Sequence, residues 1–306
     1  MNGRRVVALV WIALAAACGA RTGLLAPEIE DASQPDVKQD VHDAHAEDVV
    51  VEEDAIEEDV VFPDVPIISD CPDAGDTLVY VLGSQSELYS FYPPTRAFKY
   101  IGTIACASSS SAFSMAVTRS GIAFTCFFDG TLYEISTANA ACKGTTYAQA
   151  AQIGPFGMGY AGSPDGGETL YIADHHDHLD TIDTTSFVAS TVGSLSPPQS
   201  ECELTGSSDG RLFGFCPSQG SSSFIEIDPK TAAVISSHKL AIGLNGGSYD
   251  YAFAFWGGEF WFFLSNGGVG STVTEYDPTT QSETDVATAP IAIVGAGVST
   301  CAPLSF

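Results

Sequence analysis

A repeated signature constrains the fold of this chain more than any other feature. The segment FIEIDPKT (224–231) returns as VTEYDPTT (273–280), with weaker copies LYSFYPPT (88–95), LYEISTAN (132–139) and LDTIDTTS (179–186). The fourth residue of each copy is large and apolar, and successive copies lie 44 to 49 residues apart. A period in this range is typical of repeat architectures, in which each unit packs on its neighbours.

Each unit reads as four β-strands. The second unit contains the apolar runs FSMAV (113–117), IAFTCFF (122–128), TLYEIS (131–136) and CKGTTY (142–147). Ser-Gly and Asp-Gly pairs separate the first three runs and supply the positive φ angles of tight hairpin turns. Four antiparallel strands in about 45 residues form one blade of a β-propeller. A two-sheet sandwich is the main rival, but it does not require this period.

The two ends of the repeat region predict how the ring closes. The first unit begins at DTLVYVLG (76–83), which matches a second strand, and no innermost strand precedes it. The segment IVGAGVST (293–300) has the small residues of an innermost strand, and no blade follows it. Small residues let innermost strands approach one another closely. We therefore expect an all-β, five-bladed β-propeller over residues 71–306, closed by the C-terminal strand.

The N-terminus predicts export. Arg4 and Arg5 precede an apolar run of 12 residues, Val6 to Ala17, which is too short to span a bilayer comfortably and fits a signal peptide over residues 1–17. The following LAAAC resembles the lipobox of bacterial lipoproteins, which implies an acylated Cys18, although Ala15 stands where that motif prefers Leu. Gly19 after the cysteine favours the outer membrane by the same resemblance. Ordinary cleavage after the alanine run is the alternative.

Residues 18–70 read as a lipid-anchored, disordered linker. Between Glu28 and Asp70 there are 16 acidic residues and one Lys, which favours an extended, self-repelling chain. The whole sequence of 306 residues has a formal charge of −27, which argues against nucleic acid as a partner. We expect an outer-membrane lipoprotein on the periplasmic or cell-surface face, attached to the membrane through its lipid.

The eight cysteines indicate an oxidising compartment, because none lies in a CxxC or zinc-ligand spacing. Cys71 and Cys301 lie on either side of the repeat region, so that this pair could lock the ring. Cys202 and Cys216 lie on opposite arms of one hairpin. Cys106 and Cys142 flank the second blade, and Cys126 remains as a buried thiol. Spacing alone leaves the connectivity open.

The chain also resembles a group of uncharacterised myxobacterial-type lipoproteins. The segments that carry the resemblance are ACGARTGL, FSMAV, LYEIST, FGMGY, ELTGSSDGRLFGF, AFAFWGG and IVGAGVSTCAP. The resemblance covers most of the chain outside the acidic linker. It implies the propeller fold and the outer-membrane location, and it adds no substrate.

The segment ADHHDHLD (173–180) is the strongest local cluster of metal-ligand residue types. His175, His176 and His178 stand with Asp174, and imidazole and carboxylate together suit a divalent transition metal. The repeat places them between the second and third strands of the third blade. In an extended loop, His176 and His178 would point the same way. The alternative is a solvated hairpin loop without a cofactor.

Acidic residues on innermost strands offer a second chemistry. Five-bladed glycosidases place carboxylates there, facing the channel, where a pair can act as acid and base or nucleophile. Glu201 and Glu203 flank Cys202, and Asp250 precedes another predicted innermost strand, so Glu203 and Asp250 are the catalytic candidates. The aromatic segment 249–263 reads as two core strands, with a sugar-stacking surface as its alternative.

These features favour a non-catalytic binding or scaffold module with an unidentified protein or glycan partner in the envelope. Propellers present several loops on a rigid face, and no complete catalytic set stands out in the sequence. An envelope hydrolase or lyase at the channel mouth and metal capture by the His175–His178 loop are the two alternatives.

Overall fold

The computed structural model describes residues 77–147, 154–199, 201–245 and 249–305, which form five four-stranded antiparallel sheets. Written from the innermost strand outward, blade 1 consists of β20 (Ile293–Val298), β1 (Val79–Gly83), β2 (Glu87–Tyr92) and β3 (Ala97–Thr103). Blade 2 consists of β4 (Ala112–Val117), β5 (Ile122–Phe127), β6 (Leu132–Ser136) and β7 (Cys142–Gly144). Blade 3 consists of β8 (Gly157–Gly162), β9 (Glu168–Ala173), β10 (His178–Ile182) and β11 (Ala189–Ser194).

Blade 4 consists of β12 (Glu203–Gly206), β13 (Leu212–Cys216), β14 (Ser223–Ile227) and β15 (Val234–Lys239). Blade 5 consists of β16 (Asp250–Trp256), β17 (Glu259–Ser265), β18 (Thr272–Asp277) and β19 (Ser282–Thr288). Besides strands, the described residues contain a single 3-10 turn, Pro93–Thr95. The predicted all-β, five-bladed propeller is confirmed.

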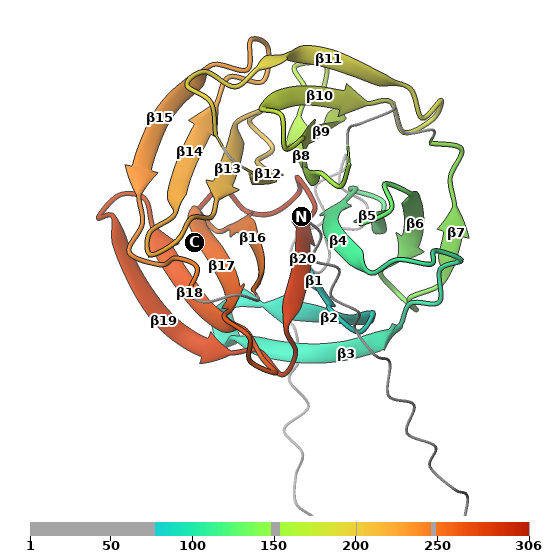
Figure 1. Ribbon diagram of the computed structural model, residues 1–306, viewed down its shortest axis with the longest axis horizontal. Helices are drawn as coiled ribbons and strands as arrows, with labels where there is room; N and C mark the ends of the chain where they lie inside the picture. Colours follow the sequence, from blue (N-terminus) through green and yellow to red (C-terminus); the bar gives the residue numbers. More distant parts are fainter. Residues whose placement is uncertain (1–76, 148–153, 200, 246–248, 306) are drawn as a thin grey trace, which may run out of the picture. The chain divides into compact units, whose positions relative to one another are not determined.

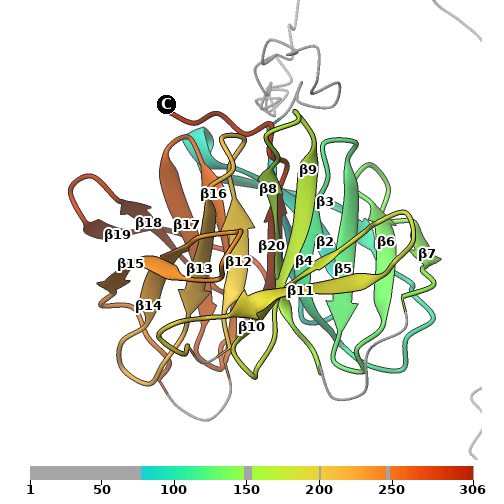
Figure 2. The same ribbon diagram turned by 90° about the horizontal axis from the view of Figure 1, so that it is seen from above.

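The five innermost strands form a closed ring, which Figure 1 shows face on and Figure 2 from the side. Each innermost strand contacts the next one around the ring, in the order β4, β8, β12, β16 and β20, and β20 contacts β4 to close it. The C-terminal strand β20 pairs antiparallel with β1, with Val298 opposite Val79. The prediction that the C-terminal strand completes the first blade is therefore confirmed, and the two ends of the described chain meet in one sheet.

Neighbouring innermost strands approach so closely that glycine is needed between them. A Cβ atom on Gly159 of β8 would lie 2.7 Å from the carbonyl carbon of Leu204 in β12. A Cβ atom on Gly157 would lie 2.0 Å from the carbonyl oxygen of Cys202. In both cases the added Cβ atom would meet backbone atoms, so no side-chain rearrangement could relieve the contact. The small residues of the innermost strands thus set the spacing of the ring.

The repeated signature forms the same structure in every blade. Its fourth residue lies on the third strand of each blade and is buried: Phe91, Ile135, Ile182, Ile227 and Tyr276. The residue five positions later adopts a left-handed conformation in all five blades, with φ between 56° and 61°: Arg96, Ala140, Phe187, Ala232 and Gln281. The aspartates of the DPxT copies stabilise this turn, since the Asp228 and Asp277 carboxylates accept backbone N–H groups two residues on.

Aromatic packing fills the space between the blades. Both strands of the aromatic segment predicted from 249–263 lie in the core, as expected. Trp256 is the last residue of β16, and its indole N–H donates to the Thr77 carbonyl oxygen of blade 1. Phe215 and Phe262 pack between blades 4 and 5, with ring centroids 4.8 Å apart. These contacts hold adjacent blades rigidly.

Two predicted disulfides are present, Cys106–Cys142 and Cys202–Cys216, and Cys126 is a buried free thiol. Burial raises the pKa of the Cys126 thiol to about 12, which keeps it unreactive at neutral pH. Cys301 is disulfide-bonded, and its expected partner Cys71 lies outside the described residues.

The signal peptide over residues 1–17, Cys18 and the acidic linker to residue 70 also lie outside the described residues. Within the described ranges, the structure contains no helix with the length and apolarity needed to cross a membrane.

Candidate functional site

The propeller has two faces that carry different residues. The loop face holds the connections between second and third strands, together with the links between blades. The hairpin face holds the turns from innermost to second strands and from third to outermost strands. Glu203 lies on the innermost strand β12, as predicted, and is its first residue. Asp250, expected just before an innermost strand, is itself the first residue of β16, so both residues lie at the loop-face ends of innermost strands.

Glu203 is buried inside the ring, with 2% of its surface exposed. Its carboxyl group accepts a hydrogen bond of 2.6 Å from the Ser114 hydroxyl of β4, and the same hydroxyl oxygen accepts the Met158 N–H of β8 at 3.1 Å. Glu203 therefore joins the innermost strands of blades 2, 3 and 4. Burial raises the pKa of Glu203 well above its usual value, although the hydrogen bonds from Ser114 and Met158 oppose this shift. The carboxyl group is an internal link between these three strands.

Asp250 lies apart from this link. It is half-buried, and burial raises the pKa of its carboxyl group. The hydrogen bonds of the described residues include none between Asp250 and Glu203, whereas the Tyr251 hydroxyl donates to Glu201 at 3.3 Å. The structure therefore does not bring the two predicted catalytic carboxyl groups together as a hydrogen-bonded pair.

The histidine cluster lies on the loop face between β9 and β10, as predicted, but the loop is not extended. It is a tight turn, because one oxygen of the buried Asp174 accepts the backbone N–H groups of His176 and His178, at 2.9 and 2.8 Å. The other Asp174 oxygen lies 3.1 Å from Nδ1 of His178. The carboxylate thus shapes the turn instead of facing a ligand.

The His175 and His176 rings lie with centroids 3.9 Å apart and their planes tilted by 41°, and the His178 ring lies 6.4 Å from that of His176. Across the described ranges, no group of three or more His, Cys, Asp or Glu side chains has an arrangement that could hold a metal ion. The local geometry of the cluster is that of a hydrogen-bonded hairpin turn.

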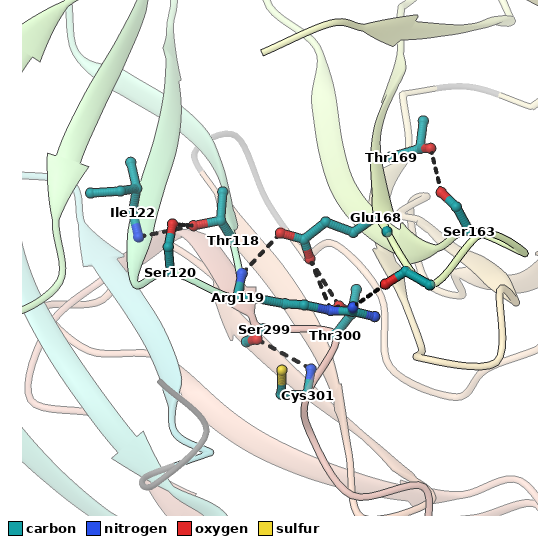
Figure 3. Close-up of polar contacts among 12 residues, drawn as sticks. Thr118, Arg119, Ser120, Ile122, Ser163, Glu168, Thr169, Ser299, Thr300 and Cys301 are labelled. Atoms are coloured by element: carbon teal, nitrogen blue, oxygen red, sulfur yellow. Dashed lines mark hydrogen bonds and ion pairs between the residues drawn. The ribbon is translucent and has the colours of Figure 1, made fainter. Parts of the chain in front are cut away.

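On the hairpin face, a polar cluster joins three blades (Figure 3). Arg119 of the β4–β5 turn donates from its backbone N–H to Glu168 at 2.9 Å and from its guanidinium to Thr300 at 2.7 Å. The Thr300 hydroxyl in turn donates to the second Glu168 oxygen at 2.8 Å. Because Thr300 follows the closing strand β20, this cluster ties the C-terminal end of the ring to blades 2 and 3.

A groove between blades 4 and 5 opens on the hairpin face and has a volume of about 550 Å³. Its floor is aromatic and includes Phe213 and Phe260. Arg211 lies on one wall, where it forms two hydrogen bonds to Glu226, at 2.8 and 3.0 Å, and covers the Phe213 ring at 4.8 Å. Ser236 on the outermost strand β15 completes this wall.

The opposite wall is acidic. It carries Glu259 and Asp277, and burial together with the neighbouring Glu275 carboxylate raises the pKa of Glu259 to about 7. Arg96 of blade 1 reaches Glu275 at 3.4 Å from the other side. The groove therefore presents hydroxyl groups, carboxylates and one guanidinium over a buried aromatic floor, which suit a polar ligand.

Sequence reasoning missed this groove. The repeat register gave one usable signal, since Arg211 and Glu226 fall on neighbouring strands of the predicted fourth blade. The distance between blades 4 and 5 cannot be read from either blade's own sequence, so the pattern did not reveal the space between them.

Fold and site together define a five-bladed β-propeller protein with an open polar groove. No protein-family model matches this chain, and no curated protein sequence matches it. Among solved structures, Kuenenia stuttgartiensis hydrazine synthase is similar, with 14% identity and a TM-score of 0.40 over 67% of this chain and 64% of that chain.

A protein of unknown function from Bacteroides thetaiotaomicron is similar with 12% identity and a TM-score of 0.46, over 61% of this chain and 53% of that chain. This chain thus spans less than two thirds of both solved chains. At such identities and TM-scores, the similarities carry no argument about function.

Proposed function

We propose that this chain is an envelope-anchored lipoprotein whose propeller is a non-catalytic binding module, and that the groove between blades 4 and 5 holds its partner. The observation that carries the proposal is the groove itself. Its volume of about 550 Å³ lies within the range typical of ligand pockets. Its walls are strands of two rigidly packed blades, so that a ligand would meet a preformed surface and little ordering cost.

The lining favours a glycan as the partner. Sugars present apolar ring faces, which stack on aromatic side chains, and hydroxyl groups, which hydrogen-bond to carboxylates and Ser or Thr. The groove offers hydrogen-bond partners in Ser236, Asp277 and Thr279, above a floor in which the Phe213 and Phe260 rings are each 2% exposed. A protein segment is the alternative occupant that the test has to separate.

The geometry of the carboxyl groups supports a binding role over hydrolysis. A general acid or nucleophile must reach the substrate, and Glu203 is enclosed between three innermost strands, with its carboxyl group engaged by Ser114. The membrane anchor is supported by the sequence of the N-terminus alone.

The binding test uses the mature chain with Cys18→Ser, so that it is not acylated, against immobilised envelope glycans, including soluble peptidoglycan fragments. Ser236→Trp places an indole in the groove, and Ser237→Trp is the matched control, because Ser237 is the next residue of β15 and is exposed outside the groove. We expect glycan binding by the parent chain and the control and its loss in Ser236→Trp. Equal binding by both Trp variants would refute the assignment to the groove, and absence of binding to any glycan would refute the glycan class.

The anchor has a separate test. Mass spectrometry of the chain produced in a bacterial host should find an acylated Cys18 as the first residue, and Cys18→Ser should release the protein from the membrane fraction. A mature protein that begins at another residue, without a lipid, would contradict the anchor while leaving the binding module untouched.

A further inference from the structure

A small aromatic pocket on the loop face has no role in the function proposed above. It has a volume of about 40 Å³ and lies where the innermost strands of blades 1, 2 and 5 meet. Four aromatic residues, one aliphatic residue and one carboxylate line it: Phe113, Phe128, Tyr249, Tyr251, Val294 and Asp250.

The backbone of β4 directs one of these rings into the pocket. Ala112 pairs with Phe127 and Ser114 pairs with Cys126, so Phe113 is an extra residue without a partner in the register. Such a β-bulge breaks the alternation of the strand and re-aims a side chain. The re-aimed Phe113 ring meets Phe128 edge to face, with centroids 5.0 Å apart.

The pocket presents its rings to solvent, where a ligand could reach them. Phe128 is 54% exposed and Tyr249 is 39% exposed, although large aromatic side chains normally seek burial. Tyr249 also lies beside Tyr251, with centroids 6.3 Å apart. Exposed rings gathered around one cavity are more typical of a recognition site than of a surface left to solvent.

The charges around the pocket are all negative. Asp250 is part of its wall, and Glu201 lies next to it, holding the Tyr251 hydroxyl. No Lys or Arg is among the residues that line it. Aromatic faces carry the negative end of the ring quadrupole, so the rings and the carboxylates favour the same sign of ligand charge.

From these observations we propose that this pocket binds a soluble, methylated ammonium cation of the choline type. A primary ammonium group has three N–H donors that need acceptors, whereas four of the six side chains that line the pocket are aromatic and the Tyr251 hydroxyl is already engaged by Glu201. A quaternary ammonium has no donor and is satisfied by ring faces. The cavity of about 40 Å³ is far smaller than the groove of about 550 Å³, so it favours a compact group over a sugar ring.

The negative charge at the pocket also distinguishes a free cation from a cationic group within a lipid head group. A phosphocholine lipid or a zwitterion carries an anion within a few bonds of the ammonium group, and this anion would face Asp250 and Glu201. A chain with a formal charge of −27 disfavours such an approach further. The free cation therefore fits better than the lipid head group.

Calorimetric titration of the mature Cys18→Ser chain tests the proposal with three probes: tetramethylammonium, choline and 3,3-dimethylbutan-1-ol, the neutral carbon analogue of choline. We expect saturable binding of both cations and at least about tenfold weaker binding of the alcohol. Equal binding of choline and the alcohol, or no saturable binding of either cation, would overturn the proposal.

Variants locate the site. Phe128→Ala removes an exposed ring and Asp250→Asn removes the charge while keeping the shape, and each should weaken choline binding about fivefold or more. Tyr100→Ala is the control, because Tyr100 is a comparably exposed aromatic residue on the outermost strand β3. Unchanged binding in both pocket variants would overturn the assignment.

Two further measurements test whether the cation is free or part of a lipid, and whether the pocket and the groove bind independently. Phosphatidylcholine vesicles should not compete with choline, and competition would overturn the preference for a free cation. Ser236→Trp in the groove should leave choline binding intact, so that failure of the glycan test and failure of this proposal remain distinguishable.

Discussion

Gly159→Ala should destabilise the propeller through backbone contact alone. Gly159 does not have a positive φ angle, so alanine fits its backbone conformation. The new Cβ, however, would lie 2.7 Å from the carbonyl carbon and oxygen of Leu204 and 2.8 Å from Cα of Thr205. Overpacking of this kind costs about 1–3 kcal/mol, against about 0.4–1 kcal/mol gained by restricting the unfolded chain. We expect a net loss of roughly 1–2 kcal/mol in the free energy of unfolding.

Gly144→Ala is the matched control. Gly144 is the last residue of the outermost strand β7, and its Cβ would meet its nearest neighbour, Cε1 of Tyr133, at an ordinary 3.7 Å. We expect it to be neutral or to stabilise by up to about 1 kcal/mol. Urea unfolding followed by the fluorescence of Trp256 and Trp261, which are both buried, reports the two midpoints. If Gly159→Ala proved as stable as Gly144→Ala, the inference that backbone contact sets the ring spacing would be refuted.

Three shorter predictions follow from other parts of the ring. Gln281→Gly should raise the free energy of unfolding by about 0.5 kcal/mol, because Gln281 is exposed at φ 56° and glycine adopts this conformation without strain. A lower free energy of unfolding in urea would contradict this prediction. Burial raises the folded pKa of Glu203 above its value of 4.5 in the unfolded chain, so its contribution to stability is fully present below that pH and is lost as pH rises through the folded pKa. Glu203→Gln should therefore gain stability relative to the parent as pH rises above about 5, by at most about 1.4 kcal/mol per pH unit, and parallel profiles of stability against pH for the two proteins would count against a buried carboxyl group. Replacing Cys202 and Cys216 by Ser removes a link across 14 residues and should lower the unfolding free energy by about 3 kcal/mol, checked in the same unfolding assay; unchanged stability would show that the link constrains neither state.

The fold could be predicted because its evidence is local and repeated. Each copy of the signature places a buried residue on a third strand, and the first unit lacks an innermost strand that β20 then supplies. The left-handed residue that ends each turn could not be predicted. Its five occupants are Arg, Phe, Gln and two Ala residues, and none is the Gly or Asn that usually marks this conformation. In four of the five blades a backbone hydrogen bond from this residue within the turn holds it there.

The candidate site was predicted less well, because it depends on distances between blades. The register correctly placed Glu203 on an innermost strand. Its burial, however, follows from the approach of Ser114, which lies 89 residues earlier in the chain. The histidine loop shows the same limit at short range. Its residue types suggested a metal, whereas the position of the Asp174 carboxylate makes it a capped turn.

The closure of the ring affects both faces of the propeller. Blade 1 takes its innermost strand, β20, from the C-terminal end of the chain. The pairing of β20 with β1 and the Arg119–Glu168–Thr300 cluster both hold this strand in the ring. A break at either place would loosen the contacts between β20 and its neighbours β4 and β16, which carry Phe113 and Asp250 of the aromatic pocket. The groove between blades 4 and 5 also depends on this end of the chain, because Leu304 and Ser305 line it and the Pro303 carbonyl oxygen accepts the Gly257 N–H at 2.9 Å. Damage to the closing strand should therefore weaken the aromatic pocket and the groove together.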